Sequence, residues 1–331
     1  MKRLLCVCGR AVYFDNHSCG NCGRQLAFDP ASLTMHAEKE PGDGLACCSN
    51  RTSTIRCNWL AQPGADTCLS CATSQIIPTL SKPENHERWR KLEQAKRRLI
   101  YELLRLGLPV DPTRLRFAFK EDRRSNPDVH DDHVSIGHAN GVITINAAEA
   151  DEVYREQMRQ QMNEPYRTLL GHFRHESGHY YFNVVVSDAL RDEARALFGD
   201  ESLPYDAALQ NYYQNGPTPG WEERYISSYA SSHPAEDWAE CWAHYLHICA
   251  VLEVADSTGL RTGVDIQKWQ TEFIDLVIAV NEVLRSLGLP DAYPFVVTSA
   301  IAKKIDFVHK AVSLFSDRQV SDRPGEPLAA S

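Results

Sequence analysis

The 331-residue sequence lacks the features by which membrane-spanning and nucleic-acid-binding chains are usually recognised. No apolar run approaches the roughly 18 residues that are needed to cross a bilayer. The formal net charge of −9 argues against a general binder of nucleic acids or membrane surfaces. The basic start of the chain is followed by too few apolar residues for a signal peptide. We therefore expect a cytoplasmic protein without a membrane partner, and a nucleic-acid partner is disfavoured.

Cysteine is nearly absent from the long C-terminal part of the sequence. Nine of the eleven cysteines lie within residues 1–71, and only Cys241 and Cys249 follow. In a reducing compartment such clustering favours metal ligation over disulfides. We interpret Cys241 and Cys249 as buried core thiols.

The first four cysteines form two close pairs, and a glycine follows each pair. The glycine lets the backbone turn so that its amides face the sulfur atoms. Four thiolates fit a tetrahedral structural zinc ion. The predicted ligands of this ion are Cys6, Cys8, Cys19 and Cys22.

Four later cysteines could bind a second structural zinc ion: Cys48, Cys57, Cys68 and Cys71. Their pairing is looser, because only Cys68 and Cys71 have the two-residue spacing of a tight knuckle. Cys47 directly precedes Cys48 and could replace it. The sequence therefore predicts one or two structural zinc ions.

The rest of the chain alternates periodic segments with polar ones. Residues 28–44 are rich in Asp, Glu, Pro and Gly and predict a connector. From Ser316 onward the composition predicts a disordered tail. The expected helices and strands follow from apolar periodicity: helices over 84–106, 166–186, 269–287 and 301–315, and strands over 115–119 and 142–146.

A basic run, Lys96 to Arg98, lies within the first of these long helices. Such a run could contact nucleic acid, but the whole chain is acidic. We therefore interpret it as a solvated helix face.

The sequence His175-Glu176-Ser177-Gly178-His179 is the stretch around which the chain is organised. Histidines four residues apart in a helix share one face, so both imidazoles can reach one metal ion. Glu176 points to the neighbouring face and can deprotonate a water molecule at the metal instead of ligating it. Gly178 leaves room for another backbone to approach closely. The alternative is a chance match on a surface helix.

A catalytic zinc site needs a third protein ligand. The metzincin pattern would require Gly at 182 and His at 185, but the chain has Phe182 and Val185, which excludes that class. Downstream, Glu236 and Glu240 lie one turn apart in an expected helix that begins at Pro234. One of them can ligate zinc while the other orients a ligand histidine. A solvated acidic face is the alternative.

This pair of helices resembles a gluzincin metallopeptidase, which has His-Glu-x-x-His followed by Glu-x-x-x-Glu on a later helix. The stretch from Tyr229 to Glu240 is similar to the catalytic domain of anthrax lethal factor. There a functional tyrosine lies seven residues before the ligand glutamate, as Tyr229 lies seven before Glu236 here. The resemblance implies that Glu236 is the ligand, Glu240 lies behind the ligands, and Tyr229 is functional.

The whole chain resembles more closely a bacterial family of zinc-ribbon, zinc-binding metallopeptidases. The residues that carry this resemblance are the N-terminal cysteine knuckles, Cys57-Asn58-Trp59, the segment 165–174 and the segment 233–247. It implies an α+β fold: a mainly helical gluzincin-like domain with a small sheet, preceded by a zinc ribbon. The implied division is a ribbon region over 1–80, a peptidase domain over 81–315 and a tail over 316–331. The resemblance also favours Cys48 over Cys47.

The resemblance further implies a catalytic zinc ion held by His175, His179 and Glu236, with Glu176 as the general base for hydrolysis of a peptide or protein substrate. Tyr229, with His233 as a weaker candidate, would stabilise the oxyanion. Gluzincin domains pair extended substrate with an edge strand of their sheet. The candidate strand consists of Val142, Ile143, Thr144, Ile145 and Asn146.

Two other interpretations remain open at this stage. The chain could be a non-enzymatic zinc-ribbon scaffold with a structural metal site, or a zinc hydrolase that acts on bonds other than peptide bonds. Glu176 discriminates against the scaffold, because a purely structural site has no use for a carboxylate that does not ligate. The ribbon could recruit a protein partner or only brace the fold.

Overall fold

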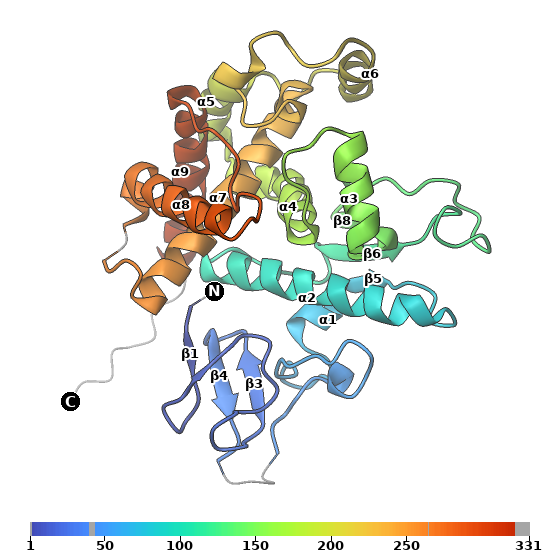
Figure 1. The fold of residues 1–331 in the computed structure, drawn as a ribbon, viewed down its shortest axis with the longest axis vertical. Coiled ribbons are helices and arrows are strands. Elements are labelled where there is room, and N and C mark those ends of the chain that lie inside the picture. Colours follow the sequence, from blue (N-terminus) through green and yellow to red (C-terminus); the bar gives the residue numbers. More distant parts are fainter. Residues whose placement is uncertain (1, 40–43, 264, 322–331) are drawn as a thin grey trace.

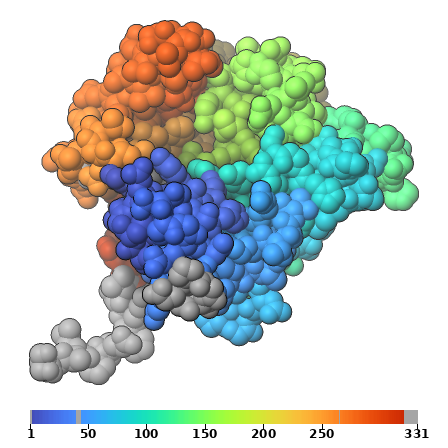
Figure 2. All heavy atoms as spheres, turned by 60° about the horizontal axis from the view of Figure 1, so that its bottom comes forward, coloured from blue at the N-terminus to red at the C-terminus, as the bar shows by residue number. Residues whose placement is uncertain are grey.

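The computed structural model describes residues 2–39, 44–263 and 265–321, which form a mainly helical body and an N-terminal lobe with small strands (Figure 1). This is the α+β architecture that the sequence predicted. Figure 2 brings the lower end of Figure 1 forward and shows the lobe lying against the body. No helix in the described ranges is long and apolar enough to cross a membrane.

The N-terminal lobe contains two antiparallel pairs of short strands. The first pair is β1 (Leu4–Leu5) with β2 (Ala11–Val12), and the second is β3 (Leu26–Asp29) with β4 (Thr34–Ala37). Two short helical turns follow: η1 (Ser49–Arg51) and α1 (Leu69–Ala72).

The β3–β4 hairpin corrects our prediction of a connector over residues 28–44. Phe28 and Met35 face each other across the two strands and are both buried. The carboxylate of Asp29 accepts backbone hydrogen bonds in the turn, so the polar residues that suggested a connector form a hairpin turn instead. Residues 40–43 of the predicted connector lie outside the described residues.

Helix α2 (Pro83–Arg105) lies between the lobe and the rest of the body (Figure 1). The prediction that its basic run is a solvated face was wrong for Lys96 and Arg97, whereas the side chain of Arg98 is 39% exposed. Lys96 is fully buried and forms an ion pair with Glu93 at 2.9 Å. Arg97 is 4% exposed, and its positive charge helps to lower the pKa of Cys57, after larger effects of the neighbouring cysteines. The lobe covers Arg97, whose charge faces its cysteine cluster, whereas Lys96 lies over the rings of Phe117 and Phe119 in the body.

The small sheet of the body has four strands in the order β5-β6-β8-β7. Strands β5 and β8 are parallel to β6, and β7 is antiparallel to β8. Their bounds are β5 (Ser74–Ile76), β6 (Arg116–Lys120), β7 (Gly137–Ala139) and β8 (Val142–Asn146).

The prediction that Val142 to Asn146 is the substrate-binding edge strand was wrong. Strand β8 matches the predicted bounds, but it lies between β6 and β7. The Asn140–Gly141 turn folds residues 137–139 back onto it, and these residues have no hydrophobic alternation that would have revealed a strand. At the other end of β8, the side-chain amide of Asn146 donates to the carbonyl of Val134 at 3.2 Å.

Helix α4 (Leu169–Val185) carries the His-Glu-x-x-His sequence. It begins three residues later than the predicted start at Tyr166. The hydroxyl of Thr168 accepts a hydrogen bond from the amide of Gly171 at 3.0 Å and caps the first turn. This cap fixes where the helix begins.

Helix α7 (Pro234–Thr258) crosses α4 at Gly178. A Cβ atom on Gly178 would lie 2.9 Å from Cα of Ala239 and 3.1 Å from the ring of Trp242. The indole of Trp238 donates to the carbonyl of Gly178 at 2.9 Å, which locks the crossing. The expected close backbone approach at this glycine is confirmed.

The prediction of a disordered tail from Ser316 onward was wrong for residues 316–321. Helix α9 continues through residues 316–321, and the hydroxyl of Ser316 donates to the carbonyl of Leu106 at 2.7 Å. The rest of the predicted tail, 322–331, lies outside the described residues. The remaining elements are η2 (Ala147–Ala150), α3 (Glu152–Gln161), α5 (Asp188–Phe198), α6 (Tyr205–Asn215), η3 (Trp221–Glu223), η4 (Tyr229–Ser231), η5 (Ile266–Lys268), α8 (Trp269–Ser286) and α9 (Ser299–Ser321).

The Gly178→Ala variant tests the crossing. The added methyl group would overlap the backbone of Ala239, so we expect the free energy of unfolding to fall by about 1–3 kcal/mol. Chemical denaturation measures this change. Gly137→Ala is the matched control, because a Cβ atom there meets nothing within 4 Å. Equal stabilities of the two variants would contradict the assigned contact.

Candidate functional site

Three groups of potential metal ligands come together in the described part of the chain. Two consist of four cysteines each, in the lobe, and the third consists of His175, His179 and Glu236, in the body. Within each group the potential ligand atoms lie within 4.8 Å of one another. The structure thus brings together the residues that the sequence singled out, although ligation itself stays a prediction.

The third group is formed by two helices. Helix α4 presents both histidines on one face, and Glu236 reaches them from the first turn of α7. The Nε2 atom of His175 lies 3.0 Å from Oε2 of Glu236, and Nε2 of His179 lies 3.3 Å from Oε1. Two imidazole nitrogens and one carboxylate match the three protein ligands of a catalytic zinc site.

Glu240 lies one turn beyond Glu236, on the other side of His175. Its Oε1 atom is 2.7 Å from Nδ1 of His175, the ring nitrogen that faces away from the ligand group. A carboxylate in this place fixes the tautomer and orientation of a ligand histidine. Burial alone would lower the pKa of His175, but Glu236 and Glu240 outweigh it and raise that pKa well above 6.5.

Glu176 lies beside this group without joining it. The side chain is 6% exposed, and its Oε2 atom has no hydrogen-bond partner among the described residues. Burial raises the pKa of this carboxyl above its usual value. An unpaired buried carboxyl oxygen is unfavourable unless a ligand or water completes its contacts, so the site fits an additional polar group here.

Of the two predicted oxyanion donors, Tyr229 lies beside the ligand group, whereas His233 caps a helix. The ring of Tyr229 lies 6.1 Å from the ring of His175, at the edge of the ligand group. Both ring nitrogens of His233 are already engaged: Nδ1 accepts from the amide of Ala235 at 3.0 Å, and Nε2 faces the carbonyl of Leu203 at 3.1 Å. His233 caps α7, so its prediction as a donor to substrate was wrong.

Tyr205 is a site residue that the sequence did not reveal. Its hydroxyl donates to Oε1 of Glu236 at 2.6 Å, and its ring packs against His233. Tyr205 begins α6, far from both motifs in the chain, and belongs to no recognisable spacing. Only the folded arrangement of α6 against the start of α7 brings it to the ligand carboxylate.

The first cysteine cluster lies between the β1–β2 turn and the knuckle that precedes β3. Sulfur–sulfur distances are 3.6 Å from Cys6 to Cys22 and 3.7 Å from Cys8 to Cys19. All these thiols are free of disulfides. Four sulfur atoms at this separation can surround one ion tetrahedrally.

The second cluster contains Cys48 and not Cys47, and its members are buried except for Cys71, which is half-buried. The Sγ atoms of Cys57 and Cys68 are 3.6 Å apart, and Sγ of Cys68 accepts a hydrogen bond from the amide of Cys71 at 3.3 Å. Four thiols without disulfides, three of them buried, fit a closed structural site. Both clusters and their chemistry agree with structural zinc.

The whole chain can be compared with known proteins. The family described as "Putative zinc-binding metallo-peptidase" matches residues 85–311, which is more than half of the chain. The chain belongs to this family. A zinc-ribbon domain family matches residues 3–82, which include both cysteine clusters. The metallo-peptidase match includes α4, α7 and all three residues of the His-His-Glu group.

Three relatives of this metallo-peptidase family member carry the name "Uncharacterized protein". Proteins of Mycobacterium bovis (strain ATCC BAA-935 / AF2122/97) and Mycobacterium tuberculosis (strains CDC 1551 / Oshkosh and ATCC 25618 / H37Rv) are each 37% identical over 326 residues. Each comparison covers 92% of this chain and 93% of the relative. No solved structure matches the chain.

The two glutamates of α7 can be separated by their effect on zinc. Because Glu236 faces both Nε2 atoms, Glu236→Gln should remove one zinc ion per chain. Glu240→Gln should keep that ion and weaken its affinity by about 10–100-fold, because Glu240 contacts only the far nitrogen of His175. Metal analysis and chelator competition measure both effects. Loss of zinc from the Glu240 variant alone would reverse the two roles.

The three groups predict three zinc ions per chain in the purified protein. Replacing Cys19 and Cys22 together by serine should remove one of them, destabilise the lobe and leave the ion at His175. Elemental analysis and limited proteolysis measure these changes. Cys249→Ser is the matched control, because this buried thiol belongs to none of the groups. Unchanged zinc in the double variant would refute the first cluster as a metal site.

Proposed function

We propose that this chain is a zinc-dependent peptidase that hydrolyses peptide bonds, with Glu176 as the general base. One observation carries the proposal: a buried carboxylate with an unpartnered oxygen lies next to a His-His-Glu group and does not belong to it. A structural zinc site would not need such a group. A catalytic zinc site does need one, because a carboxylate beside the open coordination position can act as a base.

When bound, zinc would polarise the substrate carbonyl and acidify the attacking water. Glu176 takes one proton from that water while a carbon–oxygen bond forms at the carbonyl carbon. The same carboxyl then gives the proton to the amide nitrogen as the carbon–nitrogen bond breaks. Water is consumed, and the products are a carboxylate and an amine.

Two tyrosines support this reaction in different ways. Burial, followed by the charge of Glu236, raises the pKa of Tyr229, so its hydroxyl keeps its proton and can donate to the developing oxyanion. Tyr205 already donates to Glu236 and acts as a positioning residue, because it holds the carboxylate towards the two histidines. In this proposal Tyr229 contacts the substrate, and Tyr205 contacts Glu236, the proposed metal ligand.

A cytoplasmic setting belongs to the same proposal. Reducing conditions keep the eight cysteines of the two clusters free of disulfides and available as metal ligands. A peptide or protein is the proposed substrate, and the ribbon is a candidate surface for a protein partner.

The Glu176→Gln variant tests the proposed base. Because the amide cannot accept the proton, turnover of a cleaved peptide should fall by about 10²–10⁴-fold, while zinc content and stability stay unchanged. Tyr229→Phe should also keep zinc and lose about 10²–10³-fold, the usual effect of removing one oxyanion donor. Substrates come from an unbiased peptide library, and cleavage is followed by mass spectrometry.

Glu222→Gln, an exposed exchange of the same kind, is the control. Full activity of Glu176→Gln would refute the mechanism. A wild-type protein that holds three zinc ions yet cleaves nothing across the library or a cell lysate would favour the scaffold instead.

A further inference from the structure

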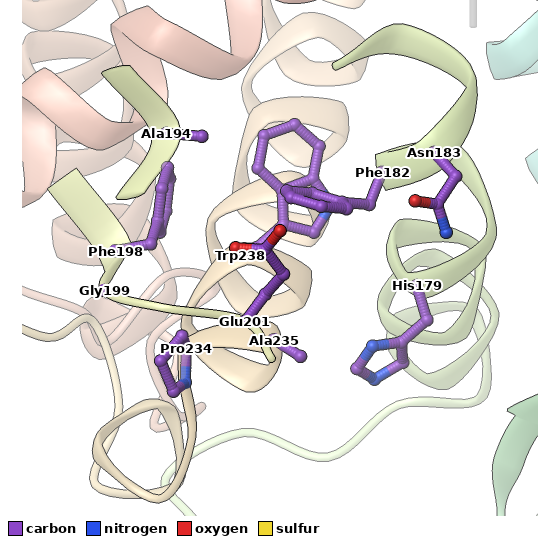
Figure 3. A pocket seen from close by; sticks show the side chains of 10 residues that line it. All are labelled: His179, Phe182, Asn183, Ala194, Phe198, Gly199, Glu201, Pro234, Ala235 and Trp238. Atoms are coloured by element: carbon purple, nitrogen blue, oxygen red, sulfur yellow. The ribbon is translucent and has the colours of Figure 1, made fainter. Parts of the chain in front are cut away.

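A cavity of about 200 Å³ opens beside His179, between α4, α5 and the first turns of α7 (Figure 3). Its aromatic walls are Phe182, Phe198 and Trp238, one from each of these helices. We propose that this cavity binds a bulky apolar side chain of the peptide substrate and so selects the residue at one fixed position beside the scissile bond. This inference rests on the proposed peptidase function.

The dimensions of the cavity suit one side chain. An apolar cavity of about 150 Å³ accommodates a benzene-sized molecule, so about 200 Å³ can hold the side chain of Leu, Met or Phe. The walls are preorganised: the rings of Phe182 and Phe198 lie 5.1 Å and 5.6 Å from Trp238. Trp238 is 1% exposed and is held by its hydrogen bond to Gly178. A rigid apolar wall binds a matching side chain without a reorganisation penalty.

The one carboxylate at the cavity, Glu201, already has its partners. Arg195 contacts both oxygens of Glu201, at 2.9 Å and 3.1 Å, and Arg191 donates to Oε1 at 2.8 Å. Two guanidinium groups offset its single negative charge, so Glu201 is not available to recognise a lysine or arginine side chain. The chemistry of the cavity therefore favours an apolar occupant over a basic one.

The cavity is continuous with the proposed catalytic group. His179 is both a wall of the cavity and a member of the His-His-Glu group. Ala235, another lining residue, directly precedes Glu236 in the first turn of α7. We therefore place the backbone of a substrate residue whose side chain fills the cavity beside His179. This geometry couples recognition of the side chain to placement of the neighbouring peptide bond.

A peptide library that varies each position around the cleaved bond tests the assignment. For the zinc-loaded wild type, we expect kcat/KM at one position to be about 10–200-fold higher for Leu, Met or Phe than for Gly. Ala194→Leu adds bulk to the α5 wall, where Ala194 faces the cavity (Figure 3). In this variant kcat/KM should fall about tenfold or more for peptides with the bulky residues and stay unchanged for peptides with Gly.

Ala196→Leu is the matched control, because the same change on the same helix lies on the exposed face. It should retain the wild-type preference. Ala235→Leu fills the cavity from the opposite wall and serves if Ala194→Leu does not fold. It should show the same loss of preference with unchanged zinc content.

The outcomes separate the two proposals. If the wild type cleaves peptides with no apolar preference, or prefers Lys or Arg at that position, the cavity assignment is wrong and the peptidase function stands. If both Ala194→Leu and Ala235→Leu keep the wild-type preference for bulky apolar residues, the cavity assignment is also wrong. If the zinc-loaded wild type cleaves no peptide, the peptidase function and the cavity assignment both fall.

Discussion

The contact between α4 and α7 at Gly178 is the constraint on which the candidate site depends. A glycine allows the two backbones to approach, and the indole of Trp238 fixes their relative position through the carbonyl of Gly178. Each helix supplies ligands that are useless without the other, because His175 and His179 belong to α4 and Glu236 to α7. Side-chain flexibility cannot replace this contact, since a preorganised site requires its supporting helices to be fixed.

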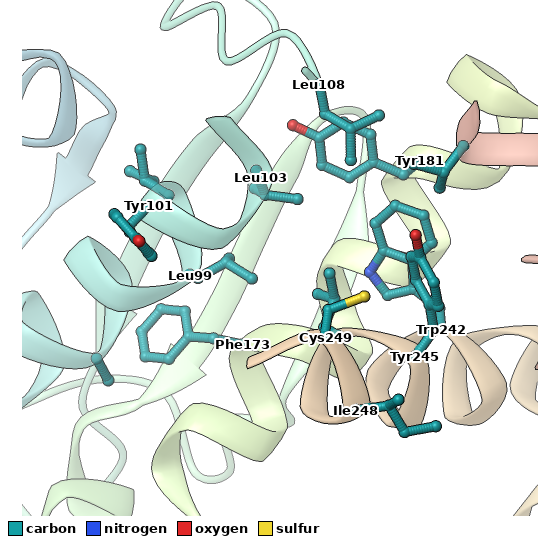
Figure 4. Close-up of a cluster of buried hydrophobic side chains, with 14 of the residues drawn as sticks. Leu99, Tyr101, Leu103, Leu108, Phe173, Tyr181, Trp242, Tyr245, Ile248 and Cys249 are labelled. Carbon is teal, nitrogen blue, oxygen red and sulfur yellow. The ribbon is translucent and has the colours of Figure 1, made fainter. Parts of the chain in front are cut away.

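The same hydrophobic core connects the site to the N-terminal lobe (Figure 4). Leu99 and Leu103 on α2 face Phe173 on α4, and a buried ion pair between Arg174 and Glu102 joins the same two helices at 2.7 Å. On its other face, α2 contributes Tyr101 to the aromatic core of the lobe, where its ring lies 5.4 Å from that of Phe14. The lobe therefore braces α2, on which α4 with its His-Glu-x-x-His sequence rests.

Sequence reasoning succeeded where the chemistry depends on local spacing. The four-residue spacing of the two histidines, and of Glu236 and Glu240, fixes which side chains share a helix face once each helix forms. It failed where a distant element decides the environment. Arg97 looks solvated until the lobe covers it, and Lys96 until the sheet of the body does. Residues 137–139 become a strand only because β8 offers an edge. Tyr205 reaches Glu236 through tertiary packing alone, so no pattern along the chain could have identified it.

The charges at the site explain why a metal ion belongs there. Glu176, Glu236 and Glu240 bring three carboxyl groups together, and the two histidines face them. Burial disfavours a proton on His175, but Glu236 and Glu240 outweigh this effect, raise its pKa and favour a proton there, and burial raises the pKa of Glu176. A dication held by His175, His179 and Glu236 would displace that proton and favour the ionised form of Glu176. The arrangement that could hold a metal ion is thus also the one that would suit Glu176 to the proposed role of base.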